Sequence, residues 1–170
     1  MALRTIREIG DPILEKKCRP IKEMTDKIRT LIADMYDTMY EADGVGLAGP
    51  QVGVLKRICV IDTREEGEKV CLINPEILET SGEQEGDEGC LSVPGRCGFV
   101  RRPSHVVIKA LNEEMEEVEI TADDLFARAI LHEMDHMDGI LYVTKVEGEL
   151  KYVNAGEYEE ELQEDTPEGE

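Results

Sequence analysis

Apolar residues near the start of the chain recur at the spacing of one helical face. Between positions 25 and 44 they stand at i, i+3, i+4, i+7 and i+11: Ile28, Leu31, Ile32, Met35 and Met39. Because an α-helix turns once in about 3.6 residues, this spacing predicts an N-terminal amphipathic helix. Thr25 or Asp26 can cap its start, and Asp43 with Gly44 can end it.

The middle of the chain carries short runs of β-branched residues instead. Four runs predict strands: residues 57–62, 70–75, 105–111 and 116–121. The last two are joined by the polar sequence NEEM, which predicts a hairpin.

A second helix is predicted over ADDLFARAILHEMDHMD, residues 122–138. Thr121, with Asp124 three residues later, has the form of a capping box, and Gly139 is a natural stop. The order helix, strands, helix favours an α+β fold with antiparallel or mixed strands, because a doubly wound fold would alternate strands and helices.

The sequence GVGLAG, residues 44–49, fits the G-x-G-x-x-G template of a dinucleotide-binding turn. That turn needs a strand before it and a helix after it, so that the helix N-terminus meets the phosphates. Here a predicted helix precedes the glycines, and Pro50 and a strand-like run follow them. The context argues against a nucleotide site.

Composition indicates one acidic domain. The chain of 170 residues has 39 acidic and 19 basic residues, for a formal net charge of −20. This charge argues against electrostatic binding to nucleic acid or to an anionic membrane. We expect a single domain over residues 1–150, followed by an acidic C-terminal tail over residues 151–170 that is solvated and has no role in the fold.

Cysteine usage and the absence of targeting signals predict a cytoplasmic protein, or the mature form of an imported one. The five cysteines are an odd number, scattered along the chain, and form no C-x-x-C pair, so a disulfide framework is not expected. The sequence shows neither a signal peptide nor an apolar run of 18 residues.

The strongest chemical signal is HEMDH, residues 132–136. Two histidines at i and i+4 lie on one helical face and can reach one metal ion, while Glu133 is displaced by about 100° and can contact a water molecule beside it. Leu125 and Ala129 precede the histidines on this face, so it should point inward. The alternative is an amphipathic helix with two surface histidines.

A catalytic metal needs a third ligand, and the residues alone leave it open. Tyr142 occupies the position of the third histidine in the astacin-like pattern and is a poor ligand. Glu157 or a neighbour would be a Glu ligand from the acidic tail, and His105 is better explained as a surface residue. Composition does not choose between Cys90, in the turn-like sequence EGCLS, and Cys97.

Three motifs together resemble the signature of the peptide deformylase family: GVGLAGPQVG (44–53), EGCLS (88–92) and HEMDH (132–136). The sequences GDPIL (10–14) and NPEIL (74–78) resemble it as well, and the likeness extends from about residue 4 to residue 146. The resemblance implies a catalytic domain whose strands pack around a central helix that carries HEMDH.

The resemblance also implies a metal-dependent reaction. The ligands would be Cys90, His132 and His136, and the metal one divalent ion, usually Fe(II) in this family, with Zn(II), Ni(II) or Co(II) able to replace it. The reaction would remove the N-formyl group from the N-terminal methionine of nascent peptides and release formate.

The remaining roles follow from the same resemblance. Glu133 would transfer the proton, while the Gln51 side-chain amide and the Leu91 backbone N–H would stabilise the oxyanion. Substrate contacts would come from the backbone of Gly46 and from a methionine pocket formed by Val45, Leu125 and Ala129. Glu88 and Arg102 would form a pair that positions the cysteine loop, and Asp135 would be a solvated helix residue.

Some features depart from the family pattern. Leu131, Gly49 and Met137 replace the usual Gln, Ala and Leu, which affects packing more than chemistry. No basic C-terminal helix for docking on the ribosome is evident, so any ribosome association should be transient.

Two other functions compete with this interpretation. A peptidase built on H-E-x-x-H would use a third ligand other than Cys90. A non-enzymatic binding module would have lost Glu133 or Gln51, and both residues are present.

Overall fold

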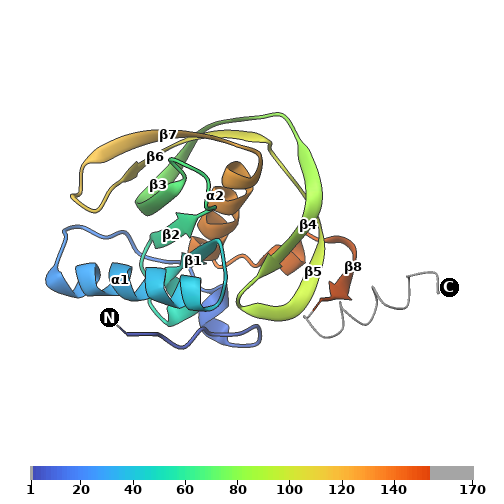
Figure 1. Ribbon diagram of the computed structural model, residues 1–170, viewed down its shortest axis with the longest axis horizontal. Helices are drawn as coiled ribbons and strands as arrows, with labels where there is room; N and C mark the ends of the chain where they lie inside the picture. The colour runs from blue at the N-terminus through green and yellow to red at the C-terminus, as the bar shows by residue number, and fades with distance from the viewer. Residues whose placement is uncertain (1, 154–170) are drawn as a thin grey trace.

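Two antiparallel sheets and two α-helices make up residues 2–153, the part of the chain that the computed structural model describes (Figure 1). The helices are α1 (Asp26–Glu41) and α2 (Asp124–Met137), and three short 3₁₀ turns, η1 to η3, span Pro12–Glu15, Gly49–Val52 and Tyr142–Thr144. The strands are β1 (Gly46–Ala48), β2 (Ile58–Asp62), β3 (Lys69–Ser81), β4 (Gln84–Cys90), β5 (Val93–Arg102), β6 (His105–Leu111), β7 (Glu117–Asp123) and β8 (Glu147–Tyr152).

The larger sheet has the strand order β1-β2-β3-β6-β7, and every neighbouring pair in it is antiparallel. The predicted α+β class with antiparallel strands is therefore confirmed. The predicted hairpin is also confirmed, because β6 and β7 pair in continuous register from His105↔Asp123 to Leu111↔Glu117. No helix among residues 2–153 is long and apolar enough to cross a membrane.

The smaller sheet, β4-β5-β8, was not predicted. Its first strand reads QEGDEGC, which has no alternation of apolar and polar residues. The sequence EGCLS was expected to be a turn, but Cys90 is the last residue of β4, and the turn comes after it. Pairing with β5, from Gln84↔Arg102 onward, holds this strand in place despite its composition.

Helix α1 begins as the sequence predicts. The Thr25 hydroxyl caps it by accepting a hydrogen bond from the backbone N–H of Ile28 at 3.2 Å. The apolar stripe is buried in a core cluster together with Leu47, Ile58 and Val60 from β1 and β2. The helix therefore fixes the position of the loop that enters β1.

Helix α2 begins differently from the prediction. The prediction of a capping box at Thr121 is wrong, since Thr121 lies in β7 and pairs with Val107. The N-cap residue is Asp123, whose side chain makes no capping hydrogen bond. The strand thus runs directly into the helix, because its pairing with β6 continues as far as Asp123.

Helix α2 is buried along most of its length and lies between the two sheets in Figure 1. Its apolar residues share a core cluster with Ala48, Ile61, Leu72 and Ile108 of the larger sheet. The histidines of α2 thereby lie near Cys90, the last residue of β4.

The predicted acidic tail lies mostly outside the described residues, which end at Val153. Its first residues belong to β8: Lys151 pairs with Cys97, and Tyr152 pairs with Arg96. The Tyr152 hydroxyl accepts a hydrogen bond from Arg96 Nη2 at 2.8 Å. Residues up to 152 thus form part of the smaller sheet.

Candidate metal centre and active site

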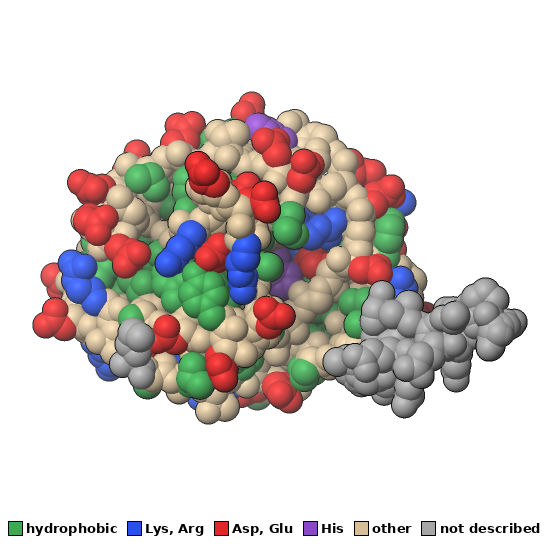
Figure 2. Space-filling view, in the orientation of Figure 1, with side chains coloured by type: hydrophobic (Ala, Val, Ile, Leu, Met, Phe, Trp, Pro, Cys, Tyr) green, Lys and Arg blue, Asp and Glu red, His purple; other side chains and the backbone are tan. Residues whose placement is uncertain are grey.

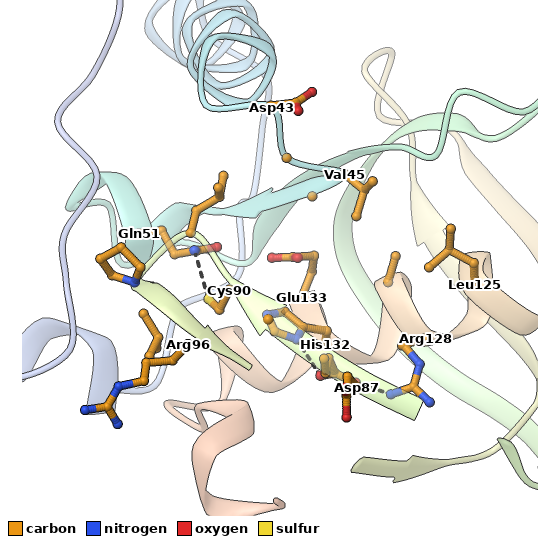
Figure 3. A pocket seen from close by; sticks show the side chains of 18 of the residues that line it. Asp43, Val45, Gln51, Asp87, Cys90, Arg96, Leu125, Arg128, His132 and Glu133 are labelled. Atoms are coloured by element: carbon orange, nitrogen blue, oxygen red, sulfur yellow. Dashed lines mark hydrogen bonds and ion pairs between the residues drawn. The ribbon is translucent and has the colours of Figure 1, made fainter. Parts of the chain in front are cut away.

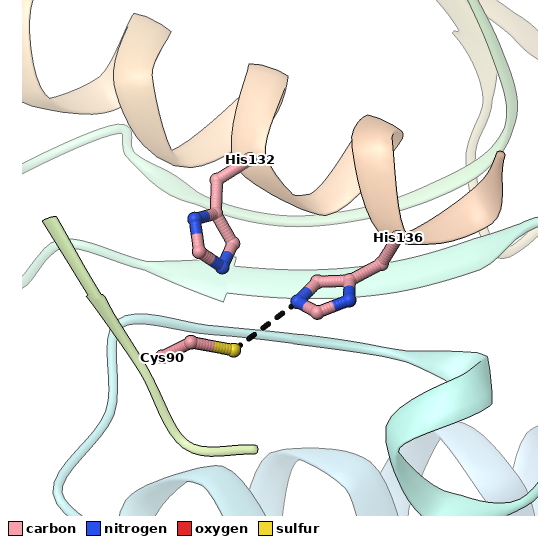
Figure 4. A group of neighbouring side chains, drawn as sticks. All are labelled: Cys90, His132 and His136. Atoms are coloured by element: carbon pink, nitrogen blue, oxygen red, sulfur yellow. Dashed lines mark hydrogen bonds between the residues drawn. The ribbon is translucent and has the colours of Figure 1, made fainter. Parts of the chain in front are cut away.

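Three side chains converge between α2 and the end of β4 (Figure 4). One ligand atom from each of Cys90, His132 and His136 lies within 4.8 Å of the other two. Cys90 Sγ is 3.3 Å from His136 Nε2. Cys97, the other candidate cysteine, lies on β5 outside this group.

The first histidine is oriented by a buried carboxylate. Glu88 Oε1 lies 2.6 Å from His132 Nδ1, so this nitrogen donates its hydrogen to Glu88, and Nε2 is the ring nitrogen that can bind a metal. Glu88 also accepts two hydrogen bonds from Arg102, at 2.6 and 2.8 Å, and one from Arg128 at 2.6 Å. The predicted Glu88–Arg102 pair is present, and the same carboxylate orients a candidate ligand.

The donor set fits a divalent transition metal. One thiol and two imidazoles supply three ligand atoms, and sites with three protein ligands keep a further position open for water or substrate. Cys90 and His132 also line the adjacent pocket, so an open position can face it.

Burial changes the protonation of the two glutamates beside the histidines. It raises the pKa of Glu133 to about 7, so this carboxyl can both accept and release a proton near neutral pH. Burial also tends to raise the pKa of Glu88, but hydrogen bonds from Arg102 and His132 outweigh it and hold this pKa well below the usual range. Glu88 is therefore an anion, whereas Glu133 can change its protonation state near neutral pH.

The Gln51 amide is held beside the cysteine. Gln51 lies in η2 and is buried, and its Oε1 accepts a hydrogen bond from the Ala48 backbone N–H at 2.9 Å. Its Nε2 donates to Ser92 Oγ at 3.0 Å and lies 3.5 Å from Cys90 Sγ. Because the carbonyl end of the amide is fixed, the NH₂ end points into the centre (Figure 3).

Two glycines allow the loop before β1 to approach the centre closely. A Cβ at Gly46 would lie 2.5 Å from Glu133 Oε2, and one at Gly44 would lie 2.6 Å from Leu91 Cδ1. A side chain at either position would force Leu91 or Glu133 to shift. The G-x-G sequence is thus explained by space around a carboxylate and a leucine, and no phosphate is needed.

A pocket of about 420 Å³ opens next to the centre (Figure 3). Its lining includes nine of the predicted site residues: Val45, Gly46, Gln51, Cys90, Leu91, Leu125, Ala129, His132 and Glu133. His136 lies behind them and is fully buried. A histidine is visible in the hollow at the centre of the face in Figure 2, with acidic side chains spread around it.

Two of the predicted pocket residues lie at its mouth. Leu125 is 51% exposed and Val45 is 39% exposed, whereas Ala129 is buried. The helical face that carries the histidines is therefore not buried along its whole length, because no element within residues 2–153 covers the first turn of α2 at Leu125.

Several polar contacts around the centre were not predicted from the sequence. Asp135 was expected to be solvated, but it accepts a hydrogen bond from Arg102 Nη1 at 2.9 Å and pairs with Lys145 at 3.4 Å. Arg128 and Ser92 were not singled out. Arg128 stands four residues before His132, a spacing that puts both side chains on one face, and this was the available signal.

We expect Cys90→Ser to lose metal and Cys97→Ser to keep it. A hydroxyl is a much weaker ligand for a transition metal than a thiolate, so the first variant should bind metal at least about tenfold more weakly. Cys97 makes the matched control, since it is a partly buried cysteine in the neighbouring strand. Metal content of the purified proteins and competition with a chelator measure the effect. Equal metal content and affinity in both variants would contradict Cys90 as a ligand.

Known proteins with similar sequences share one family. The model of the polypeptide deformylase family matches residues 3–151. The peptide deformylase of Agathobacter rectalis is 61% identical over 150 residues, which are 88% of this chain and 94% of that protein. The peptide deformylase of Lachnoclostridium phytofermentans is 58% identical over 162 residues, 95% of this chain and 99% of that protein.

Solved structures of peptide deformylases have the same fold. The crystal structure of the Thermotoga maritima protein matches with a TM-score of 0.83 at 36% identity, covering 87% of this chain and all of that one (100%). A class I type b enzyme from Acinetobacter baumannii, with Met-Ala-Ser bound, matches with a TM-score of 0.81 at 36% identity over 85% of this chain and 99% of that one. Deformylation of nascent peptides is the function of this family, and its members use a divalent metal. This chain belongs to the polypeptide deformylase family.

Proposed function

We propose that Cys90, His132 and His136 hold the divalent metal with which this deformylase removes the N-formyl group of nascent polypeptides. The observation that carries the proposal is the convergence of these ligand atoms beside Glu133 in one pocket. When bound, the metal would act there as a Lewis acid. We also propose that α2 is the central element of the fold, held in place by the two sheets.

Glu133 transfers the proton. Its carboxyl takes a proton from the attacking water and gives that proton to the amine nitrogen as the bond between this nitrogen and the formyl carbon breaks, so that the nitrogen leaves as a neutral amine. The products are formate and a free N-terminus. Two observations support this role: Glu133 Oε1 is buried and has no hydrogen-bond partner among the described residues, and its pKa of about 7 suits both transfers.

Charge that develops on the formyl oxygen needs hydrogen-bond donors in addition to the metal. The Gln51 NH₂ group and the Leu91 backbone N–H fill this role. The fixed orientation of the Gln51 amide supports it, because donors that are already in place need no reorganisation during the reaction.

The peptide binds along the backbone at Gly46, and its methionine side chain lies among Val45, Leu125 and Ala129. Their common place in the pocket supports this assignment. The match to an enzyme with bound Met-Ala-Ser supports a site for a peptide that begins with methionine. Partial exposure of Val45 and Leu125 suits a pocket that a side chain enters from the surface.

Three further proposals concern the metal, the location and the tail. We propose Fe(II) as the metal in the cell, with Zn(II), Ni(II) or Co(II) able to replace it, and the cytoplasm as the location. We propose that the catalytic domain, predicted as residues 1–150, extends to Tyr152, the last residue of β8. The acidic residues that follow give no basic surface for ribosomal RNA, so any association with the ribosome is transient.

Formate release from a short N-formyl-methionyl peptide tests the function. Protein prepared anaerobically with Fe(II) should release formate, and neither the N-acetyl peptide nor a chelator-treated sample should react. Analysis of the same peptides for internal cleavage tests the peptidase alternative. Absence of formate from metal-loaded protein would contradict the proposal.

We expect removal of residues 154–170 to leave the kcat/KM for a small formyl peptide within about twofold of its original value. A chain that ends at Val146 should lose about fivefold or more, because Arg96, which lines the pocket, then loses its hydrogen bond to Tyr152. Steady-state kinetics of the two truncations measure both effects. A large loss in the first truncation would show that the acidic tail takes part in catalysis.

A further inference from the structure

The segment Asp43–Gly46 leads from α1 into β1 and forms one wall of the pocket. Strand β1 pairs with β2 from Gly46↔Ile61 onward, and the backbone N–H of Asp62 donates to Val45 O at 2.9 Å. One residue earlier this pattern of backbone bonds stops. The carbonyl of Gly44 accepts from a side chain instead, Arg64 Nη1 at 2.8 Å.

Several contacts fix the Arg64 side chain. The same Nη1 also donates to the Asp62 carbonyl at 2.7 Å, and the Arg64 backbone N–H donates to Asp62 Oδ1 at 2.8 Å. The guanidinium carbon lies 5.2 Å from the centre of the Tyr40 ring, where the cation is attracted to the ring face. The Tyr40 hydroxyl in turn donates to Asp62 Oδ2 at 2.6 Å. The guanidinium is thus held by both neighbouring elements, α1 and β2.

Asp62 is negatively charged at neutral pH. Hydrogen bonds from the Tyr40 hydroxyl and from the Arg64 backbone lower its pKa below the usual value. Arg64 therefore lies next to a permanent anion and is itself always charged.

Gly44 lies between Arg64 and the pocket and contacts both. Its N–H donates to Met39 O at 2.9 Å, so both of its backbone polar groups are bonded. On the pocket side, Gly44 packs against the Leu91 side chain and Gly46 against Glu133, so closely that a Cβ at either glycine would push the facing side chain away. An outward shift of Gly44 would therefore widen the space between the loop and Leu91.

We propose that Arg64 is a positioning residue for the peptide substrate: it bonds to the Gly44 carbonyl and so sets the separation of the two pocket walls, the glycine loop and Leu91. The proposal rests on the function proposed above. In that function the loop contacts the peptide main chain, away from the formyl carbon at which bonds change, so we expect this contact to be the same before and during the reaction. Loss of the Arg64 bond should therefore weaken binding and leave the chemical step nearly unchanged.

Kinetics of Arg64→Ala and Arg64→Lys test this role. The alanine variant should raise KM for a formyl-methionyl peptide about tenfold, the effect of losing a charged hydrogen bond, with kcat within about twofold. Lysine should restore part of the loss, because it can reach a carbonyl but lacks the planar fork that bonds two groups. Arg101→Ala is the matched control: the Arg101 side chain is 45% exposed, against 42% for Arg64, and it pairs with three glutamates away from the pocket.

Hydrogen exchange provides a readout that does not depend on activity. Backbone amides in residues 42–48 should exchange faster in Arg64→Ala than in the original protein, and no faster in Arg101→Ala. An unchanged KM, an equal rise in KM in the Arg101 variant, or unchanged exchange in residues 42–48 would overturn the proposal. If the original protein released no formate while exchange in this segment still increased in Arg64→Ala, the function would fail and the loop contact would stand.

Discussion

Glu133→Gln is expected to lower kcat about a thousandfold while the protein keeps its metal. A general acid–base group typically accelerates a reaction 10²- to 10⁴-fold. We expect a loss near the middle of this range, because one carboxyl serves both proton transfers. Glutamine has nearly the same shape, so the packing of Gly46 against this side chain should remain. Formate release and metal content, measured on the same preparation, test the expectation.

The control for this variant is Glu119→Gln, an exposed residue on β7 that lies outside the pocket. It should leave kcat unchanged. Full activity of Glu133→Gln would remove Glu133 from the proton-transfer role. Loss of metal along with activity would instead indicate a structural role at the centre.

The helices could be predicted from sequence because each buries one regular face. The spacing of Ile28, Leu31 and Met35 defines α1, and the two histidines add a ligand spacing to the apolar pattern of α2. Both patterns are local, so they need no knowledge of the rest of the chain. The hairpin β6–β7 was predictable for the same reason, since its strands are neighbours in sequence.

The smaller sheet could not be predicted because its pairing is not local. Strand β4 consists mainly of Gly and acidic residues. It is held by its pairing with β5 and by the ion pair between its own Asp87 and Lys151 of β8. A single sequence does not reveal such partners. Choosing Cys90 over Cys97 depends on this sheet, because only the end of β4 reaches the histidines.

The buried polar network was predicted only in part. The pairing of Glu88 with Arg102 came from the family resemblance, whereas the contacts of Arg128 with Glu88 and of Arg102 with Asp135 depend on how α2 packs against β4. A helical wheel gives the face of a residue and says nothing about what covers it. For this reason it also misjudged Leu125, which lies uncovered at the pocket mouth.

Glu88→Gln is expected to have the largest effect on stability. It removes the one carboxylate that Arg102, Arg128 and His132 share. The variant leaves Arg128, whose side chain is 9% exposed, without an ion-pair partner among the described residues, and it leaves Arg102 with Asp135 alone. Loss of these buried charge pairs should cost about 3 kcal/mol in the free energy of unfolding. The affinity for metal should also fall about 10- to 100-fold, because His132 loses the group that orients its ring.

Urea denaturation and chelator competition measure these two effects. Glu85→Gln is the matched control: Glu85 lies three residues earlier on the same strand, its side chain is 45% exposed, and it pairs with Arg101 at the surface. An exposed ion pair contributes at most about 1 kcal/mol, so this variant should be nearly as stable as the original protein and should bind metal equally well. If Glu88→Gln also kept its stability and metal affinity, the buried carboxylate would not be what orients His132.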